Sequence, residues 1–299
     1  MRFVPAPDTT ASSLLRDPPD ETAIAGFEEA GAIVVRGLIG REWLGSLREN
    51  YARMARSADQ PFGVGKPYGE GDRTGQERKL INRSGMWEDN DAFRAFLFES
   101  PIARAAAAVM RSRTAQLYED LLITEPAGGK PHNSWHQDAA SWPMTGSMLS
   151  SVWLSLEAVT AETGAMRFVK GSHRGPSYQP SYIDPKDVGD DALRWTGGKF
   201  PDVNEDPSFT IVQTETNPGD AVIFHPAAIH CAYGSAKNRD RRSFTIRFMG
   251  DDVRWLPLNR TYHPWMQALP LKKGEKIVAE RMPVVWTAAL SNRVLSPSA

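Results

Sequence analysis

The second half of the chain is a series of short β-type runs, and residues typical of turns separate one run from the next. From Leu117 onward these runs, rich in β-branched and aromatic side chains, alternate with Gly, Pro, Asp and Asn. No helical pattern lies between them, which argues against a parallel α/β sheet. The series predicts a mainly β fold in which two antiparallel sheets close on each other in a jelly-roll plan. The runs are LYEDLLIT, SVWLSL, AMRFV, FTIVQT, DAVIFH and SFTIRF.

The first part of the chain has helical periodicity instead. Apolar residues recur at three- and four-residue spacing after Asp20 and again over 41–58, and a further helical stretch at 90–111 is interrupted at Pro101. Gly31 ends the first helix, and the run AIVVRGL that follows it reads as a strand. We therefore expect N-terminal helices that pack on one sheet of the β core.

The absence of a linker between these parts predicts one domain. Residues 1–19 have no apolar period and are expected to form an N-terminal arm. Two polar segments rich in Gly or Pro are expected to cover a site as lids, and they decide which substrate enters. We expect a single domain over 20–299. Its expected divisions are a helical layer at about 20–111, a β core at about 115–250 and a C-terminal extension at 251–299, with lids at 59–90 and 174–207.

Composition limits the partners and the compartment. The 35 Lys and Arg residues nearly balance the 36 Asp and Glu residues, so no net field attracts nucleic acid or an anionic membrane. One Cys among 299 residues is too few for a disulfide scaffold or a thiolate metal site. The opening MRFVPAPDTT lacks the apolar core of a signal peptide, and no apolar run is long enough for a membrane span. We expect a cytoplasmic protein with a small-molecule substrate.

The stretch Ser134–Asp138 offers metal ligands. In an extended segment residues i and i+2 point to the same side, so His136 and Asp138 present an imidazole and a carboxylate together. His230, at the end of a downstream strand, would complete a set of two imidazoles and one carboxylate, which favours non-haem Fe(II) and leaves coordination positions open. His225 is the competing ligand, but it also reads as a hydrogen-bonded core histidine. His132, His173 and His263 have contexts that suit structural or peripheral positions better.

A cationic anchor follows the last ligand candidate. Arg241 and Ser243 share one side of the strand SFTIRF with Thr245 and Arg247, whereas Arg242 shares the apolar side with Phe244. A guanidinium beside a hydroxyl suits a carboxylate, and a polar side suits a liganded interior. We therefore favour Arg241 over Arg242 as the anchor of a 2-oxo dicarboxylate.

These motifs together resemble the phytanoyl-CoA dioxygenase family of Fe(II)- and 2-oxoglutarate-dependent oxygenases. The likeness covers about residues 22–250 and implies a double-stranded β-helix core, one Fe(II), 2-oxoglutarate and O2. It implies that His136, Asp138 and His230 ligate iron and that Arg241 binds the far carboxylate of 2-oxoglutarate. The residues that carry it are FEEAGAIVVRGLI, Trp135–Asp138, Thr163–His173, Pro218–Asp220, Phe224–His230 and Arg241.

The chain departs from the family pattern in three places. Thr163 and Lys170 stand where Asn and Pro are frequent, and both lie in a turn. Many members carry a Lys just before a Glu-Pro pair, whereas Thr124 precedes Glu125-Pro126 here. Thr124 is therefore a candidate cofactor contact whose chemistry differs from that of the family.

Four further side chains are candidates for the pocket. Trp153 on the strand SVWLSL is expected to pack on the cofactor, with plain core packing as the alternative. Trp142 and Met144 are candidates for a substrate wall, again with core packing as the alternative. Arg247 either faces the entrance or, as we favour, pairs with Asp251 or Asp252.

The function expected from these residues is oxidation, typically hydroxylation, of a C–H bond in a small metabolite, with release of succinate and CO2. Asp138 favours hydroxylation over halogenation, because a halide needs the position that the carboxylate occupies. Two alternatives stay open: a non-catalytic small-molecule-binding β-barrel, and a cupin-like metalloenzyme that does not use 2-oxoglutarate. The chain shows no basic stripe for the phosphates of CoA, which favours a free small molecule over an acyl-CoA.

Overall fold

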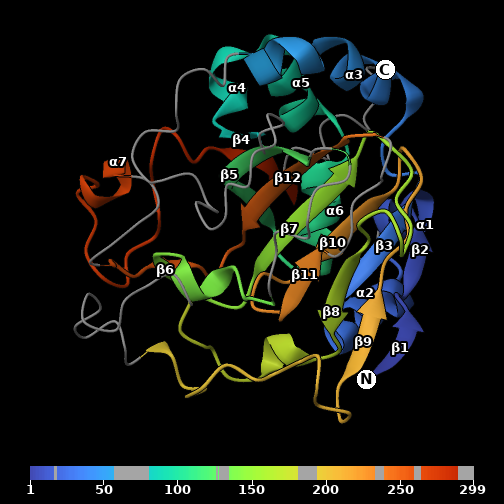
Figure 1. Cartoon of the computed structure of the whole chain (residues 1–299). Coiled ribbons are helices and arrows are strands. Elements are labelled where there is room, and N and C mark those ends of the chain that lie inside the picture. Colours follow the sequence, from blue (N-terminus) through green and yellow to red (C-terminus); the bar gives the residue numbers. More distant parts are fainter. Residues whose placement is uncertain are drawn as a thin grey trace, which may run out of the picture.

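Two β-sheets face each other at the centre of the molecule (Figure 1). In the computed structural model the larger sheet has the order β14-β5-β12-β7-β10-β3-β2, and β4 also pairs with β5. Its strands are β2 (Asp8–Thr10), β3 (Ala32–Arg36), β4 (Ile81–Ser84), β5 (Thr114–Glu125), β7 (Leu149–Ser155), β10 (Ala221–Phe224), β12 (Arg241–Met249) and β14 (Val284–Thr287). The structure describes residues 1–16, 19–56, 81–125, 127, 135–180, 194–232, 239–258 and 264–288.

The smaller sheet has the order β1-β9-β8-β11. Its β8, β9 and β11 pair antiparallel, as the larger sheet's central strands do, and the six runs singled out in the sequence all become strands. This arrangement confirms the mainly β, jelly-roll expectation. The strands are β1 (Arg2–Pro5), β8 (Met166–Val169), β9 (Thr210–Gln213) and β11 (His230–Ala232), and a separate two-stranded ribbon joins β6 (Met144–Thr145) to β13 (Arg254–Trp255).

Helices cover the outer face of the larger sheet, as expected. The second helix begins after Asp20, whose carboxylate accepts from the backbone N–H of Thr22, and it ends at Gly31, which has a left-handed φ of 83°. Pro101 separates two further helices. No helix among the described residues is long and apolar enough to cross a membrane. The helices are α1 (Ala11–Leu15), α2 (Glu21–Ala30), α3 (Arg41–Arg56), α4 (Met86–Asp89), α5 (Asp91–Glu99), α6 (Ile102–Val109) and α7 (Pro264–Gln267).

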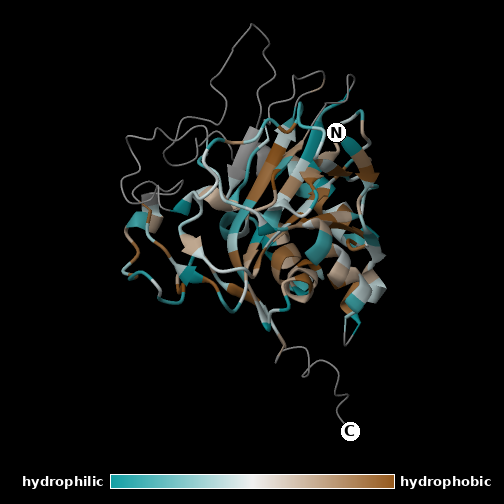
Figure 2. Ribbon diagram, turned by 90° about the horizontal axis from the view of Figure 1, so that it is seen from below, coloured by the Kyte–Doolittle hydropathy of each residue, from teal (hydrophilic) through white to brown (hydrophobic). Residues whose placement is uncertain are grey.

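The two faces of β12 separate two interiors. Phe244, Ile246 and Phe248 are fully buried in an apolar core between the larger sheet and the helices. Arg241, Ser243, Thr245 and Arg247 alternate with them and point to the other side, toward the smaller sheet. Figure 2 shows the hydrophobic residues concentrated on the central strands and on the helices beside them. A strand this polar on one face and apolar on the other places a polar interior between the sheets.

The first residues differ from the expected arm. Arg2–Pro5 pairs in parallel with β9, Asp8–Thr10 pairs in parallel with β3, and Leu14 is completely buried. The N-terminus therefore adds an edge strand to each sheet. Sequence periodicity missed this because edge strands pair through their backbones while their side chains stay largely exposed, so no apolar alternation marks them.

Asp120 provides a test of the contact between β5 and the helical layer. Its buried carboxylate accepts from the backbone N–H groups of Gly85 at 2.7 Å and Trp87 at 3.2 Å, at the start of α4. Burial raises the pKa of Asp120 to about 6, although those N–H groups oppose the shift.

A raised folded-state pKa means that the folded state gains protons, and stability, as the pH falls through 6. Asp120→Asn removes this titration. We expect the free energy of unfolding of the wild type, minus that of the variant, to rise by about 1 kcal/mol between pH 7 and pH 5. Denaturant titrations at both pH values would measure it, and an unchanged difference would contradict it.

Candidate metal centre

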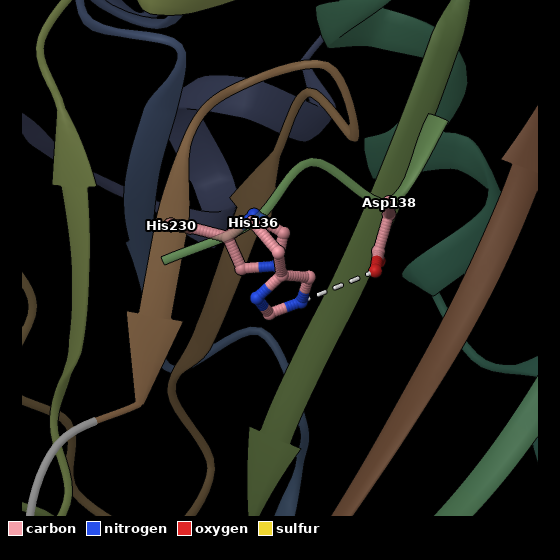
Figure 3. Close-up of side chains that lie close together, drawn as sticks. All are labelled: His136, Asp138 and His230. Carbon is pink, nitrogen blue, oxygen red and sulfur yellow. Dashed lines mark ion pairs between the residues drawn. The ribbon is translucent and has the colours of Figure 1, made fainter. Parts of the chain in front are cut away.

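Three side chains converge between the two sheets. His136 lies in an extended segment that pairs with β11, and the backbone N–H groups and carbonyls of His136 and His230 exchange hydrogen bonds of 3.0 and 2.9 Å. Asp138 follows at the start of the 3-10 turn Ala139–Ser141. One potential ligand atom from each of these three residues lies within 4.8 Å of the others. Figure 3 shows the two imidazoles side by side with the Asp138 carboxylate directed toward them, as the sequence predicts.

His230 is oriented for ligation. Its Nδ1 lies 2.8 Å from the carbonyl oxygen of Ala228, which can only accept, so Nδ1 carries the proton and Nε2 presents a lone pair. The ring is buried against the side chains of Phe224 and Phe168. Burial and the neighbouring His136 lower the pKa of His230 to about 4, although Asp138 opposes the shift. His230 is therefore neutral near pH 7, the form in which imidazole binds a metal.

Asp138 is held ionised by a buried arginine. Its Oδ2 accepts from Nη2 of Arg247 at 2.9 Å, while Oδ1 lies 3.5 Å from Nε2 of His136. Burial raises the pKa of Asp138, but Arg247 and the two imidazoles lower it more, so the pKa stays well below its usual range. One carboxylate oxygen is thus tied to Arg247 and the other faces the imidazoles.

The expected pairing of Arg247 with Asp251 or Asp252 is wrong. Arg247 forms ion pairs with Asp138 and with Glu119 of β5, and its guanidinium lies 5.3 Å from the ring centroid of Trp142. Asp251 and Asp252 instead accept from backbone N–H groups at the strand ends. The bulge between Arg247 and Phe248 leaves Arg247 opposite Glu119, a register that spacing along one strand does not reveal.

The residues present fit a ferrous ion with an oxygen-rich ligand. Two imidazoles and one carboxylate are the donor set of non-haem Fe(II) sites. Among the described residues three buried polar atoms on the interior face lack a hydrogen-bond partner: Nε of Arg241, Nε of Arg247 and Oγ of Ser151. Buried polar groups are normally satisfied, so these atoms indicate a ligand that offers acceptors.

Arg241 faces this interior and Arg242 does not. Arg241 is 4% exposed, donates from Nη1 to the carbonyl oxygen of Gly164 before β8, and lies with its guanidinium 5.8 Å from the ring centroid of Trp153. Arg242 points to the helical side, where it pairs with Glu157. The strand register is therefore the expected one. Ser243 is buried beside Arg241, and its hydroxyl lies 3.3 Å from the carbonyl oxygen of Ile123.

Thr124 lies on the wrong side of β5 for a cofactor contact. Its hydroxyl hydrogen-bonds to that of Tyr51 in α3, so it faces the helices. Its neighbour Glu125 points into the interior and forms an ion pair with Arg241. Because side chains alternate along a strand, the residue beside the anchor is the first residue of the Glu-Pro pair and not the one before it.

Trp142 and Met144 belong to a third apolar cluster with Tyr118 and Trp255, so core packing describes them better than a substrate wall. Trp153, in contrast, lies on the interior face opposite Thr245. An open groove of about 520 Å3 is lined by Trp135, the residue before His136, but by none of the three ligand candidates. Its lining residues are Trp135, Lys199, Phe200, Pro201, Asp202 and Val203.

The other histidines occupy different places. His225 has both ring nitrogens engaged, Nδ1 with the N–H of Ala227 at 3.1 Å and Nε2 with the carbonyl oxygen of Ser147 at 3.0 Å, which suits a structural role. His173 packs near His225 and Gly31. His132, His263 and much of the two expected lids, at 59–80 and 181–193, lie outside the described residues.

Glu119, Glu125 and Ser151 were not singled out from the sequence. The sequence of β5 contained a signal for the two acids. Glu119 and Glu125 are six residues apart, so they lie on the same face of the strand, with Leu121 and Ile123 between them. Strand pairing then places both acids opposite arginines of β12, Glu119 opposite Arg247 and Glu125 opposite Arg241. Ser151 needed the register of β7 against β12, which no local pattern supplies.

The four residues proposed from the motifs lie within a segment that matches a known protein family. The sequence profile described as Phytanoyl-CoA dioxygenase (PhyH) matches residues 27–243, a span that includes His136, Asp138, His230 and Arg241. The chain belongs to the phytanoyl-CoA dioxygenase family. This membership confirms the resemblance drawn from the motifs, and with it a dioxygenase family and fold.

Relatives in sequence agree with this assignment, and solved structures share the fold. The peroxisomal phytanoyl-CoA dioxygenase of Mus musculus is 23% identical over 249 residues, which cover 79% of this chain and 70% of that protein. The non-heme alpha ketoglutarate dependent carbocyclase SnoK superposes with a TM-score of 0.70 at 18% identity, over 93% of this chain and 99% of that one. The epimerase SnoN, solved with Fe3+, alpha ketoglutarate and nogalamycin RO, gives 0.65 at 20%, over 89% and 98%.

Proposed function

We propose that this protein is an Fe(II)- and 2-oxoglutarate-dependent dioxygenase that oxidises a C–H bond of a small metabolite. The observation that carries the proposal is the convergence of His136, Asp138 and His230 on the interior face that also holds the buried Arg241. The solved complex of SnoN with iron and alpha ketoglutarate supports the same cofactors for this fold.

The chain's own residues would hold and orient these groups. His136, Asp138 and His230 would hold iron, which supplies activation of O2 and oxidative decarboxylation of 2-oxoglutarate to succinate and CO2. Arg247 keeps Asp138 ionised and ties up its Oδ2, so that Oδ1 faces the metal position. Arg241 would anchor the far carboxylate, and Trp153 packs beside that guanidinium.

Hydroxylation is the reaction that we propose first, because Asp138, as a ligand, would occupy the position that a halide needs. The substrate proposed is a free small molecule. SnoK and SnoN, which share the fold, are enzymes of nogalamycin biosynthesis. This supports a small metabolite as the substrate of this chain as well. Carbocyclisation and epimerisation in those proteins indicate that the same fold supports outcomes beyond hydroxylation.

Succinate formation tests the proposal. The purified protein, supplied with Fe(II), 2-oxoglutarate and O2, is expected to form succinate in a metal-dependent way, and a screen of small metabolites is expected to contain compounds that stimulate it. A matched reaction with chelator in place of Fe(II) is the control. If a protein shown to bind iron forms no succinate with any metabolite, the proposed function is wrong.

The two adjacent arginines of β12 give a matched test of the anchor. Arg241→Ala is expected to raise the 2-oxoglutarate concentration needed for half-maximal turnover about a hundredfold, because a buried charge-assisted contact worth about 1.5–3 kcal/mol is lost. Arg242→Ala, on the helical side of the same strand, is expected to leave it within about twofold. Steady-state succinate assays measure both, and the reverse order would refute the assignment of the anchor.

A further inference from the structure

The proposed anchor is already paired with an acid of the chain itself. Glu125 stands directly opposite Arg241 in the antiparallel register of β5 and β12, and its carboxylate forms an ion pair with Nη2 of Arg241. The two side chains are 13% and 4% exposed. A buried pair of this kind has little water to screen it, so its charges act strongly on any ion that enters beside them.

The hydrogen-bond donors of Arg241 are partly committed. Nη1 donates to the carbonyl oxygen of Gly164 and Nη2 donates to Glu125, while Nε is buried without a partner among the described residues. The guanidinium therefore retains donor capacity for an incoming acceptor, but its charge is already balanced. An incoming carboxylate would meet both the guanidinium and the Glu125 carboxylate.

Arg247, the second arginine on this face, leaves the face with more negative than positive charges. Arg247 pairs with both Asp138 and Glu119. Without iron, the described ion pairs along this face of β5 and β12 therefore contain two arginines and three carboxylates. A dicarboxylate would consequently bring its far charge to a place that the chain has already neutralised.

We propose that Glu125 is a specificity-determining residue that competes with the far carboxylate of the 2-oxo acid for Arg241. It thereby sets how strongly the site prefers a 2-oxo acid with a second carboxylate over one without it. The inference rests on the proposed function. It concerns the charge of Glu125 and not its shape, because glutamine of the same length keeps an oxygen that Arg241 can donate to.

The experiment compares the binding of two 2-oxo acids to the protein loaded with Mn(II), which replaces Fe(II) to prevent turnover. 2-Oxopentanoate has a methyl group in place of the far carboxylate of 2-oxoglutarate. Calorimetry is expected to show that Glu125→Gln binds 2-oxoglutarate about tenfold more tightly than the wild type, the scale of removing a like charge a few ångströms away. Binding of 2-oxopentanoate is expected to change less than about twofold.

The neighbouring ion pair supplies the control. Glu157→Gln removes the acid that pairs with Arg242 on the helical side and is expected to leave the ratio of the two dissociation constants unchanged. Glu125→Met, a second neutral variant of similar length, is expected to raise the preference for 2-oxoglutarate as Glu125→Gln does. It keeps the test decisive if the glutamine variant folds poorly, which thermal melting of both variants would show.

The outcomes separate the two proposals. Wild-type binding of 2-oxoglutarate with no gain in either Glu125 variant would overturn the role of Glu125 and leave the proposed function standing. Binding by the Glu125 variants but not by the wild type would support competition by Glu125 for Arg241 and would overturn the proposed function of the natural protein. If neither the wild type nor the variants bind 2-oxoglutarate although they bind Mn(II), the proposed function fails and this inference fails with it.

Discussion

Asp138→Ala is expected to lower metal-dependent succinate formation by about a hundredfold or more, together with a loss of bound iron. The substitution removes the only carboxylate of the His136, Asp138 and His230 set. It also leaves Arg247 beside two imidazoles with one fewer negative charge, so a cation would enter a site that has become more positive. Substitution of groups that hydrogen-bond to metal ligands typically lowers metal affinity or activity by about 10–100-fold, and loss of a ligand itself should lower them at least as much.

Metal content and turnover should be measured on the same preparations. Asp206→Ala is a suitable control, because Asp206 is a half-buried acid that accepts from the backbone N–H of Ser208 and is not one of the three ligand candidates. It should keep both iron and activity. An Asp138→Ala protein that forms succinate at the wild-type rate would remove Asp138 from the ligand set.

Arg247→Ala is expected to reduce the free energy of unfolding by about 3–5 kcal/mol, the usual cost of removing one partner from a buried charge network. The side chain of Arg247 is 15% exposed and forms ion pairs with two carboxylates, those of Asp138 and Glu119. Denaturant titration of the metal-free protein measures the effect. A large part of it should come from the charge that stays behind on Glu119.

Two further variants test this explanation. Adding Glu119→Gln to Arg247→Ala should restore part of the lost stability, because it removes one of the uncompensated charges. Arg242→Ala is the matched control on the same strand, and its partly exposed ion pair should be worth about 1 kcal/mol or less. An Arg247→Ala protein as stable as Arg242→Ala would show that the buried network contributes little.

The sequence predicted those parts of the molecule that depend on alternation within one strand. The alternation of side chains along β12 correctly placed Arg241 and Arg242 on opposite faces, because one face of the strand is apolar and the other is polar. The spacing of His136 and Asp138 predicted that both side chains face the same place, and they do, although Asp138 itself begins a 3-10 turn and does not continue the extended segment.

Contacts that depend on pairing between strands escaped the sequence. Arg247 was given a nearby partner, whereas Asp138 and Glu119 reach it across the sheet register and a bulge. The same ambiguity placed Thr124 instead of Glu125 beside the anchor. The edge strands of the N-terminus were missed because backbone pairing leaves no pattern in exposed side chains.

The backbone hydrogen bonds between His136 and His230 have a consequence for how the protein matures. The two ligands come from segments far apart in the chain, and they meet only where the start of β11, at His230, pairs with the segment that holds His136. Contacts of such long sequence separation form late and slowly, because the closure of a long loop must come first. We therefore expect the complete set of three ligands to form late in folding, so that iron would enter an assembled scaffold and would not guide its assembly.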